Sequence, residues 1–264
     1  MPMVRVLPVI LAVICQTSAG AGEMLTAPNK KASPINQRRA YGNACGPASL
    51  LNAFQYGSSK WQNIFYAIPG TNSKTRIRYV VSKWGERPSL HIKGIKRWDP
   101  KQGINLLDLT DMANEMRDSH FTPRIKNEIL TRKSRQKQIE LLHHSHKLIT
   151  KSLKKGLPPI LSIRRYAYRD SDEVGAKSWW PIRAHFIVVI ETPKKISRSA
   201  TSYHIKYVDP FGGYTRNGVI HTDTGDFSNS PFLAATMPGA SIGRALLRDG
   251  EETVLTFPSI IGCW

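Results

Sequence analysis

The chain has 264 residues, of which 41% are hydrophobic, so it can bury one sizeable core and is expected to form a single domain. Its 38 lysines and arginines outnumber 19 acidic residues, a formal net charge of +19 that excludes an acidic surface. Such a surface attracts anionic surfaces or polymers non-specifically. No recognised nucleic-acid-binding module accompanies the charge, so we expect no specific nucleic-acid partner.

Residues 1–21 are typical of a secretory signal peptide. Arg5 is followed by the apolar run VLPVILAVIC and by small residues ending in SAGAG, where Ala19 and Ala21 have the spacing of a cleavage site. The run is too short to cross a bilayer. We therefore predict an exported protein, periplasmic or extracellular, whose mature chain of residues 22–264 has no transmembrane helix.

Two cysteines, Cys45 and Cys263, remain when the signal peptide and its Cys15 are removed. Two thiols form no disulfide framework, but a single bridge between them would make Cys45 inert. Cys45 opens the segment CGPASLLNAF, in which Leu50 and Phe54 belong to an apolar stripe at helical spacing. We therefore expect Cys45 at a helix N-terminus, where the helix dipole lowers the pKa of a thiol.

The densest basic stretch, residues 123–156, has aliphatic residues at roughly helical intervals among its charges. This pattern predicts a basic helical insertion of one or two amphipathic helices with a solvated basic face. His143, His144 and His146 lie in the stretch, but no cysteine or acidic pair with metal-ligand spacing accompanies them. We predict solvated histidines, no metal site and no cofactor.

After the basic stretch the pattern becomes extended. The runs LPPILSIRRY and RAHFIVVIET are rich in β-branched and aromatic residues and predict core strands. A third run, SYHIKYVDPFGG, alternates and then ends in turn-forming residues. The polar connection TPKKISRSAT suits a hairpin loop. If residues 184–191 and 203–209 pair antiparallel, His185 and Asp209 lie close together.

Cys45, His185 and Asp209 together predict a catalytic triad. An imidazole beside a thiol takes its proton and stabilises the thiolate, and a third polar side chain fixes the imidazole tautomer and orientation. The ordinary alternatives are a structural core histidine and a turn-forming aspartate. Trp179 and Trp180, in the polar loop before His185, are expected either to wall the substrate cleft or to fill the core.

The segments NACGPASLLNAF, GLPPILSI, AHFIVVIE and YVDPFGG, in this order, resemble the papain-like cysteine peptidases related to the bacteriocin leader peptidases. The resemblance covers residues 37–54 and 156–213. It implies a papain-like α+β fold, in which an N-terminal helix carrying the nucleophile packs on an antiparallel sheet carrying His and Asp. The implied roles are nucleophile for Cys45, general base for His185 and orienting carboxylate for Asp209.

The resemblance also implies an oxyanion-hole glutamine shortly before the nucleophile. The usual spacing points to Arg39, and the nearest upstream glutamine is Gln37. Either Gln37 has this role through a two-residue insertion, or Asn43 takes it over, or the oxyanion is poorly stabilised. The choice bears on activity, because losing one such donor typically costs about 10²–10³ in rate.

We therefore expect an exported cysteine peptidase that cleaves a peptide or protein substrate through an acyl-enzyme. The same residues also resemble the papain-like acyltransferases related to phytochelatin synthase, which share the acyl-enzyme but transfer the acyl group to another nucleophile. A third interpretation is a catalytically silent basic domain that binds an anionic surface or partner.

Overall fold

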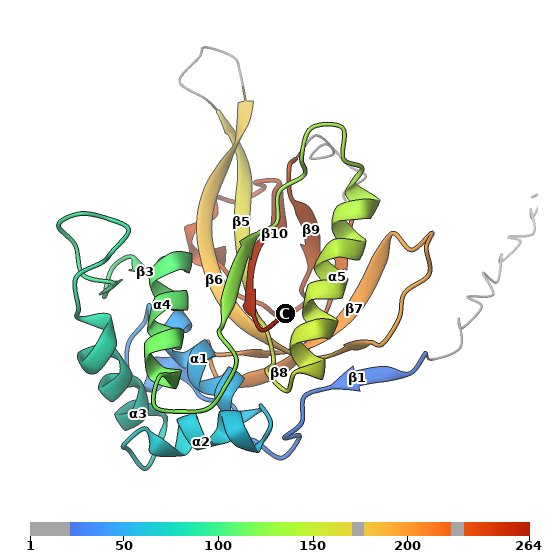
Figure 1. Ribbon diagram of the computed structural model, residues 1–264. Coiled ribbons are helices and arrows are strands. Elements are labelled where there is room, and N and C mark those ends of the chain that lie inside the picture. Colours follow the sequence, from blue (N-terminus) through green and yellow to red (C-terminus); the bar gives the residue numbers. More distant parts are fainter. Residues whose placement is uncertain (1–21, 171–176, 223–229) are drawn as a thin grey trace, which may run out of the picture.

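The computed structural model describes residues 22–170, 177–222 and 230–264, and its centre is an antiparallel sheet that closes on itself (Figure 1). Six strands follow one another around the ring, and the last pairs with the first. In ring order they are β6 (Lys177–Pro193), β5 (Ile160–Asp170), β10 (Thr253–Gly262), β9 (Leu233–Thr236), β8 (Tyr214–His221) and β7 (Ser202–Asp209).

The predicted papain-like α+β fold is therefore wrong. The described part of the chain is mostly a closed six-stranded barrel with two extra strands in the same sheet and five α-helices, rather than a helix packed on an open antiparallel sheet. The extra strands are β1 (Met24–Thr26), which pairs with β6, and β4 (Lys126–Ile129), which pairs with β10.

The barrel closes because its long strands bend and because segments outside the resemblance complete it. The register shifts where β6 faces β5 and β7, and again where β10 faces β5. Irregularities of this kind bend a strand and increase its twist. Strands β8, β9 and β10 come from residues 214–262, beyond the matched segments, and they supply half of the ring.

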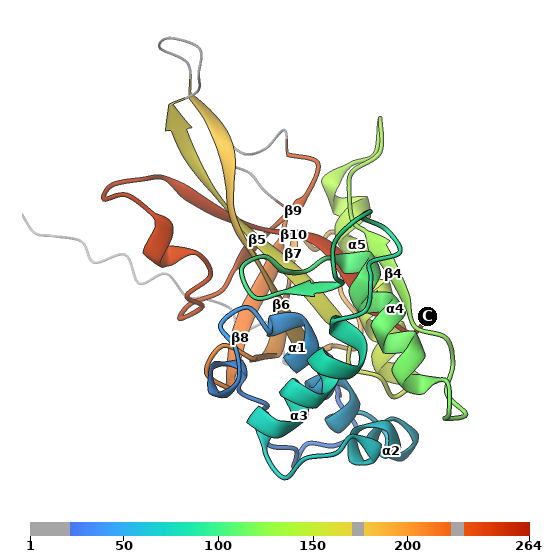
Figure 2. The ribbon, with the colours of Figure 1, turned by 90° about the vertical axis from the view of Figure 1, so that its left-hand side faces the viewer.

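A lobe of helices lies beside the barrel and carries the predicted nucleophile (Figure 2). The helix predicted to begin at Cys45 is confirmed as α1 (Cys45–Gln55), and it packs against β6. The Ser49 hydroxyl of α1 donates a hydrogen bond of 3.1 Å to the Phe186 carbonyl of β6. The lobe also contains α2 (Ser59–Ala67), α3 (Ser73–Val80), α4 (Leu106–Arg117) and the short pair β2 (Trp98–Asp99) and β3 (Gly103–Ile104).

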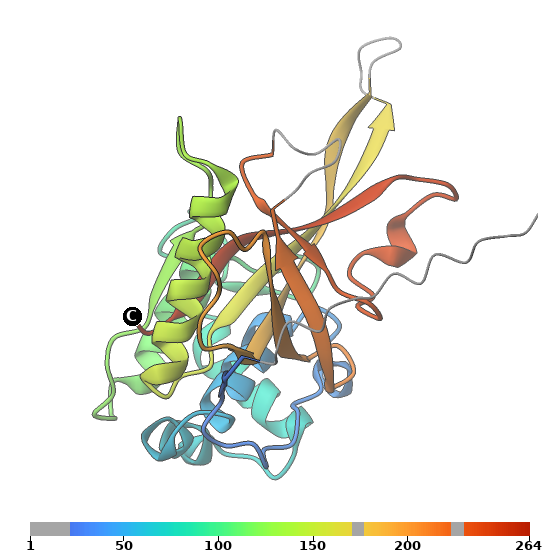
Figure 3. The same ribbon diagram turned by 90° about the vertical axis from the view of Figure 1, so that its right-hand side faces the viewer.

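The basic stretch 123–156 is helical only in its second half, so the predicted helical insertion over about 123–156 is wrong at the start. Residues 126–129 form β4, because they complete a ladder with β10. The second half is α5 (Gln138–Lys154), which lies along the outside of the barrel (Figure 3). Its buried residues include Leu142 and Ile149, so one face of this amphipathic helix covers the sheet.

The antiparallel pairing of residues 184–191 with 203–209 is confirmed by the register, in which Val188 faces Val208. Cys45 and Cys263 are both free, so the alternative of a bridge between them does not hold. The segment predicted as a signal peptide, residues 1–21, lies outside the described residues. No helix among those described has the length and apolar character needed to cross a membrane.

Candidate active site

Cys45 is the first residue of α1, and its side chain lines a cleft between the helical lobe and the barrel. The N–H groups of a first helical turn have no partners within the helix, and the helix dipole favours negative charge there. Gly46 allows the turn to pack closely, since a Cβ at this position would lie only 2.3 Å from the side chain of Ile104. The local chain therefore places a thiol where a thiolate is favoured.

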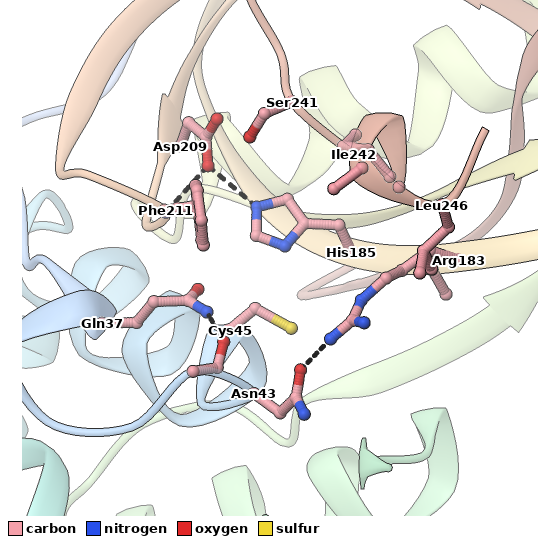
Figure 4. Close-up of a pocket in the computed structure, with 14 residues that line it drawn as sticks. Gln37, Asn43, Cys45, Arg183, His185, Asp209, Phe211, Ser241, Ile242 and Leu246 are labelled. Carbon is pink, nitrogen blue, oxygen red and sulfur yellow. Dashed lines mark hydrogen bonds and ion pairs between the residues drawn. The ribbon is translucent and has the colours of Figure 1, made fainter. Parts of the chain in front are cut away.

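His185 and Asp209 form a buried hydrogen-bonded pair opposite this thiol (Figure 4). His185, on β6, donates from Nε2 to Oδ1 of Asp209, at the end of β7, over 2.8 Å. The same oxygen accepts the Phe211 N–H at 2.8 Å, and Arg216 Nε lies 3.6 Å from Oδ2. These contacts hold the carboxylate, which in turn orients the ring so that Nδ1 faces Cys45.

The pKa values of Cys45 and His185 move in opposite directions, as a thiolate–imidazolium pair requires. Burial alone raises the pKa of the Cys45 thiol, but the hydrogen bond and charge of His185, helped by the Phe186 and Gly46 backbone N–H groups, hold it below its usual value. Burial alone lowers the pKa of His185, but its hydrogen bonds to Asp209 and Cys45 and the charges of both raise it to about 9. Both shifts therefore favour the thiolate–imidazolium form of the pair.

The cleft has a volume of about 360 Å³ and combines the polar triad with an apolar wall. The wall is formed by residues 241–243, 245 and 246 of the segment 241–246, which belongs to the connection between β9 and β10. Besides Cys45, His185 and Asp209, the lining side chains named in Figure 4 are Gln37, Asn43, Arg183, Phe211, Ser241, Ile242 and Leu246.

Gln37 and Asn43, the two predicted oxyanion donors, both line the cleft. They differ in how many side-chain amide hydrogens are already engaged in hydrogen bonds. Gln37 Nε2 donates to the Gly42 carbonyl at 2.5 Å, which engages one of its two hydrogens. Asn43 Nδ2 donates to the Pro100 and Lys101 carbonyls, each at 2.8 Å, which engages both. The amide of Gln37 therefore has a hydrogen left for a ligand, whereas that of Asn43 does not.

Sequence reasoning missed the residues at the far end of the cleft. Arg183 precedes His185 by two residues on β6, so strand alternation alone points both side chains to one face. The wall at 241–246 had no such signal, because its place depends on how β9 and β10 join the barrel. Trp179 and Trp180, predicted either to wall the cleft or to fill the core, are not among the lining residues.

One group of described side chains has the spacing of a metal site, and it lies outside the cleft lining. His91, Asp108 and Asp111 bring potential ligand atoms within 4.8 Å of one another. His91 Nε2 is 2.7 Å from Asp111 Oδ2, and buried Asp108 accepts the Ser89 hydroxyl at 2.7 Å. These contacts tie residues 89–91 to α4. The prediction of solvated histidines at 143, 144 and 146 is wrong for His146, which is buried and contacts the Pro193 carbonyl. His143 and His144 are half-buried and contact the Arg198 carbonyl and Glu128.

The chain matches no family model, no curated protein and no solved structure. The resemblance to the bacteriocin leader peptidases therefore stays a prediction. In the cleft, a helix-terminal thiol, an imidazole and a buried carboxylate converge from α1, β6 and β7.

The reactivity of Cys45 is expected to depend on His185. In the unmodified chain, iodoacetamide should label Cys45 with a midpoint below the ordinary cysteine pKa of about 8.5. In His185→Ala the midpoint should rise above that value, because burial then acts almost unopposed. Buried Cys263, whose pKa burial raises, is the internal control and should label slowly in both proteins. Equal midpoints for Cys45 in the two proteins would contradict the ion pair.

Proposed function

We propose that this protein is a cysteine hydrolase that cleaves peptide bonds through an acyl-enzyme on Cys45. The observation that carries the proposal is the convergence of Cys45, His185 and Asp209 in one cleft, with the His185–Asp209 hydrogen bond at 2.8 Å and opposed pKa shifts in the Cys45–His185 pair. A structural histidine needs a partner, but it does not need a helix-terminal thiol on its other nitrogen.

The chemistry proceeds in two halves. The Cys45 thiolate attacks the substrate carbonyl carbon, the carbonyl π electrons move to oxygen, and a tetrahedral oxyanion forms. As the C–N bond breaks, the His185 imidazolium gives its proton to the departing amine. Neutral His185 then takes a proton from water, whose oxygen attacks the thioester, and the thiolate leaves. Since the first half needs imidazolium, activity falls as pH rises through about 9.

Gln37 is the proposed oxyanion donor, together with the backbone N–H of Cys45. The free hydrogen on Gln37 Nε2 supports this assignment, as does its anchoring: the Gln37 N–H donates to the Pro210 carbonyl at 2.9 Å, next to Asp209. The donor is thus tied to the same turn as the orienting carboxylate. Asn43 has no amide hydrogen to spare, so we assign it no role in oxyanion binding.

A peptide library tests the proposal. The purified chain, lacking residues 1–21, is incubated with peptides derived from a proteome, and new N-termini are identified by mass spectrometry. We expect cleavage that is lost in Cys45→Ala and kept in Cys263→Ala, the same substitution at the other free thiol. New N-termini released in one stoichiometric burst, with Cys45 left acylated until an amine is added, would instead identify an acyltransferase. No acylation and no cleavage would leave a basic binding domain and overturn the proposal.

The place of action is also a proposal. We propose that the protein works outside the cytoplasm, because residues 1–21 have the composition of a cleavable export signal. A strongly basic chain in that setting meets anionic surfaces, to which it binds non-specifically.

A further inference from the structure

The end of the cleft beside Arg183 carries positive charge that no described carboxylate neutralises. Arg183 lines the cleft, whereas Arg244 belongs to the segment 241–246 but is exposed and does not line the cleft. Arg165 lies behind the wall, where it is buried and donates from Nε to the Ile242 carbonyl at 2.5 Å. None of these three arginines forms an ion pair within the described residues.

The aliphatic parts of the Arg183 and Arg165 side chains both lie beside Gly243, and Arg244 is the next residue in the chain. A Cβ on Gly243 would lie 3.1 Å from Arg183 Cβ and 3.8 Å from Arg165 Cδ, and the residue has a φ of 65°, which favours glycine. Burial lowers the pKa of Arg165, and the positive charge of Arg244 lowers it further. Of the three, Arg183 alone lines the cleft, and a guanidinium there without a carboxylate partner favours an anionic ligand.

Two acidic groups of this region, Asp209 and Glu251, already have partners. Asp209 is the one acidic side chain among the residues that line the cleft, and it accepts from His185 with Arg216 beside it. Glu251, which follows the wall segment, accepts from Arg169 at 2.5 and 2.9 Å. Neither carboxylate is available to Arg183, whose Nη2 donates instead to the neutral Oδ1 of Asn43.

Arg183 also lies close to His185 along β6, within reach of a peptide bound at the triad. Positions 183 and 185 are on one face of β6, and the ladder with β5 is regular between them. They are therefore about 7 Å apart along the strand, which an extended peptide spans in about two residues. Figure 4 shows the Arg183 guanidinium reaching toward Asn43, on the same side of the cleft as the Cys45 sulfur.

We propose that the cleft selects acidic peptides, with a Glu or Asp side chain within two residues of the cleaved bond held by Arg183. The guanidinium exchanges the neutral Asn43 oxygen for a carboxylate, which accepts stronger, charge-assisted hydrogen bonds. Neighbouring apolar residues of the peptide pack on Ile242 and Leu246 of the wall. The cleavage preference depends on the proposed function, whereas binding of the acidic peptide does not.

Binding is measured on Cys45→Ala, so that no turnover intervenes. The probes are octapeptides of serine, alanine and leucine with one central Glu, Gln or Lys, carrying an uncharged fluorescent label and followed by anisotropy. We expect the Glu peptide to bind at least about tenfold more tightly than the Gln peptide, as one charge-assisted contact allows. Adding Arg183→Gln should reduce this ratio to within about twofold, and Arg183→Lys should restore part of it.

Arg124→Gln is the matched control, because it removes the same charge from an exposed arginine that does not line the cleft. It should leave the Glu-to-Gln ratio unchanged. Equal binding of the Glu and Gln peptides to the parent, or equal losses in Arg183→Gln and Arg124→Gln, would overturn the inference. An Arg183-dependent preference without any cleavage would overturn the proposed peptidase and keep this inference. Cleavage with no preference for acidic residues would overturn this inference and keep the proposed peptidase.

Discussion

Asp209→Ala is expected to lower kcat on a cleaved peptide by about 10⁴-fold, the scale of loss when a triad is deprived of its carboxylate. The reason is that Asp209 Oδ1 accepts hydrogen bonds from both His185 and the Phe211 N–H. These two bonds fix the imidazole ring in its buried site. The loss should fall short of that in Cys45→Ala, which removes the attacking atom itself. Steady-state kinetics across pH measures both.

Asp209→Asn separates charge from orientation. The amide oxygen can still accept from His185 and Phe211, while the negative charge beside Arg216 is lost. We expect a smaller loss of kcat than in the alanine variant, a lower pKa for His185, and an alkylation midpoint for Cys45 that moves up toward the ordinary value. Unchanged activity and an unchanged midpoint would rule out the orienting role. Thermal unfolding of both variants separates these effects from misfolding.

Gln37→Ala is expected to lower kcat by about 10²–10³-fold, the usual loss on removing one oxyanion donor. The alkylation profile of Cys45 should not move, because Gln37 makes no contribution to the shift in the thiol pKa. KM should change little, since the oxyanion exists only after attack.

Asn43→Ala is the companion variant for the oxyanion assignment. Both of its amide hydrogens go to the Pro100 and Lys101 carbonyls, so its loss should disturb that loop more than the oxyanion. A large kcat loss in Asn43→Ala, with none in Gln37→Ala, would transfer the donor role to Asn43. Losses of kcat of the same size in both variants would indicate that catalysis depends on both side chains, and would not single out Gln37 as the donor.

The local part of the candidate site was readable from the sequence. Cys45 sits before Gly-Pro and an apolar stripe, which indicates a helix start, and His185 and Asp209 flank two strands joined by a polar loop. These signals act over a few residues to about two dozen, the range in which helix periodicity and hairpin pairing operate. The structure places all three side chains in one cleft by means of those elements.

Barrel closure was not readable, because it depends on pairing between distant strands. Alternation indicates that residues 203–209 form a strand, but it does not say that β7 has β8 on one edge and β6 on the other. The basic stretch shows the same limit: residues 126–129 have helical spacing, yet they pair with β10 at residues 259–262. Tertiary pairing overrode the local pattern there.

Strand β10 joins β4, β5 and β9, and its Thr256 contacts Arg164, 92 positions earlier in the chain. Contacts this distant close large loops, and chains dominated by them fold slowly. The ring that carries His185 and Asp209 is complete only when β10 has docked. An unfolding chain therefore loses the imidazolium partner of Cys45 together with the barrel, and an incompletely folded chain holds an ordinary, weakly reactive thiol. Formation of the proposed Cys45–His185 pair is thus expected to coincide with the slowest folding phase of the chain.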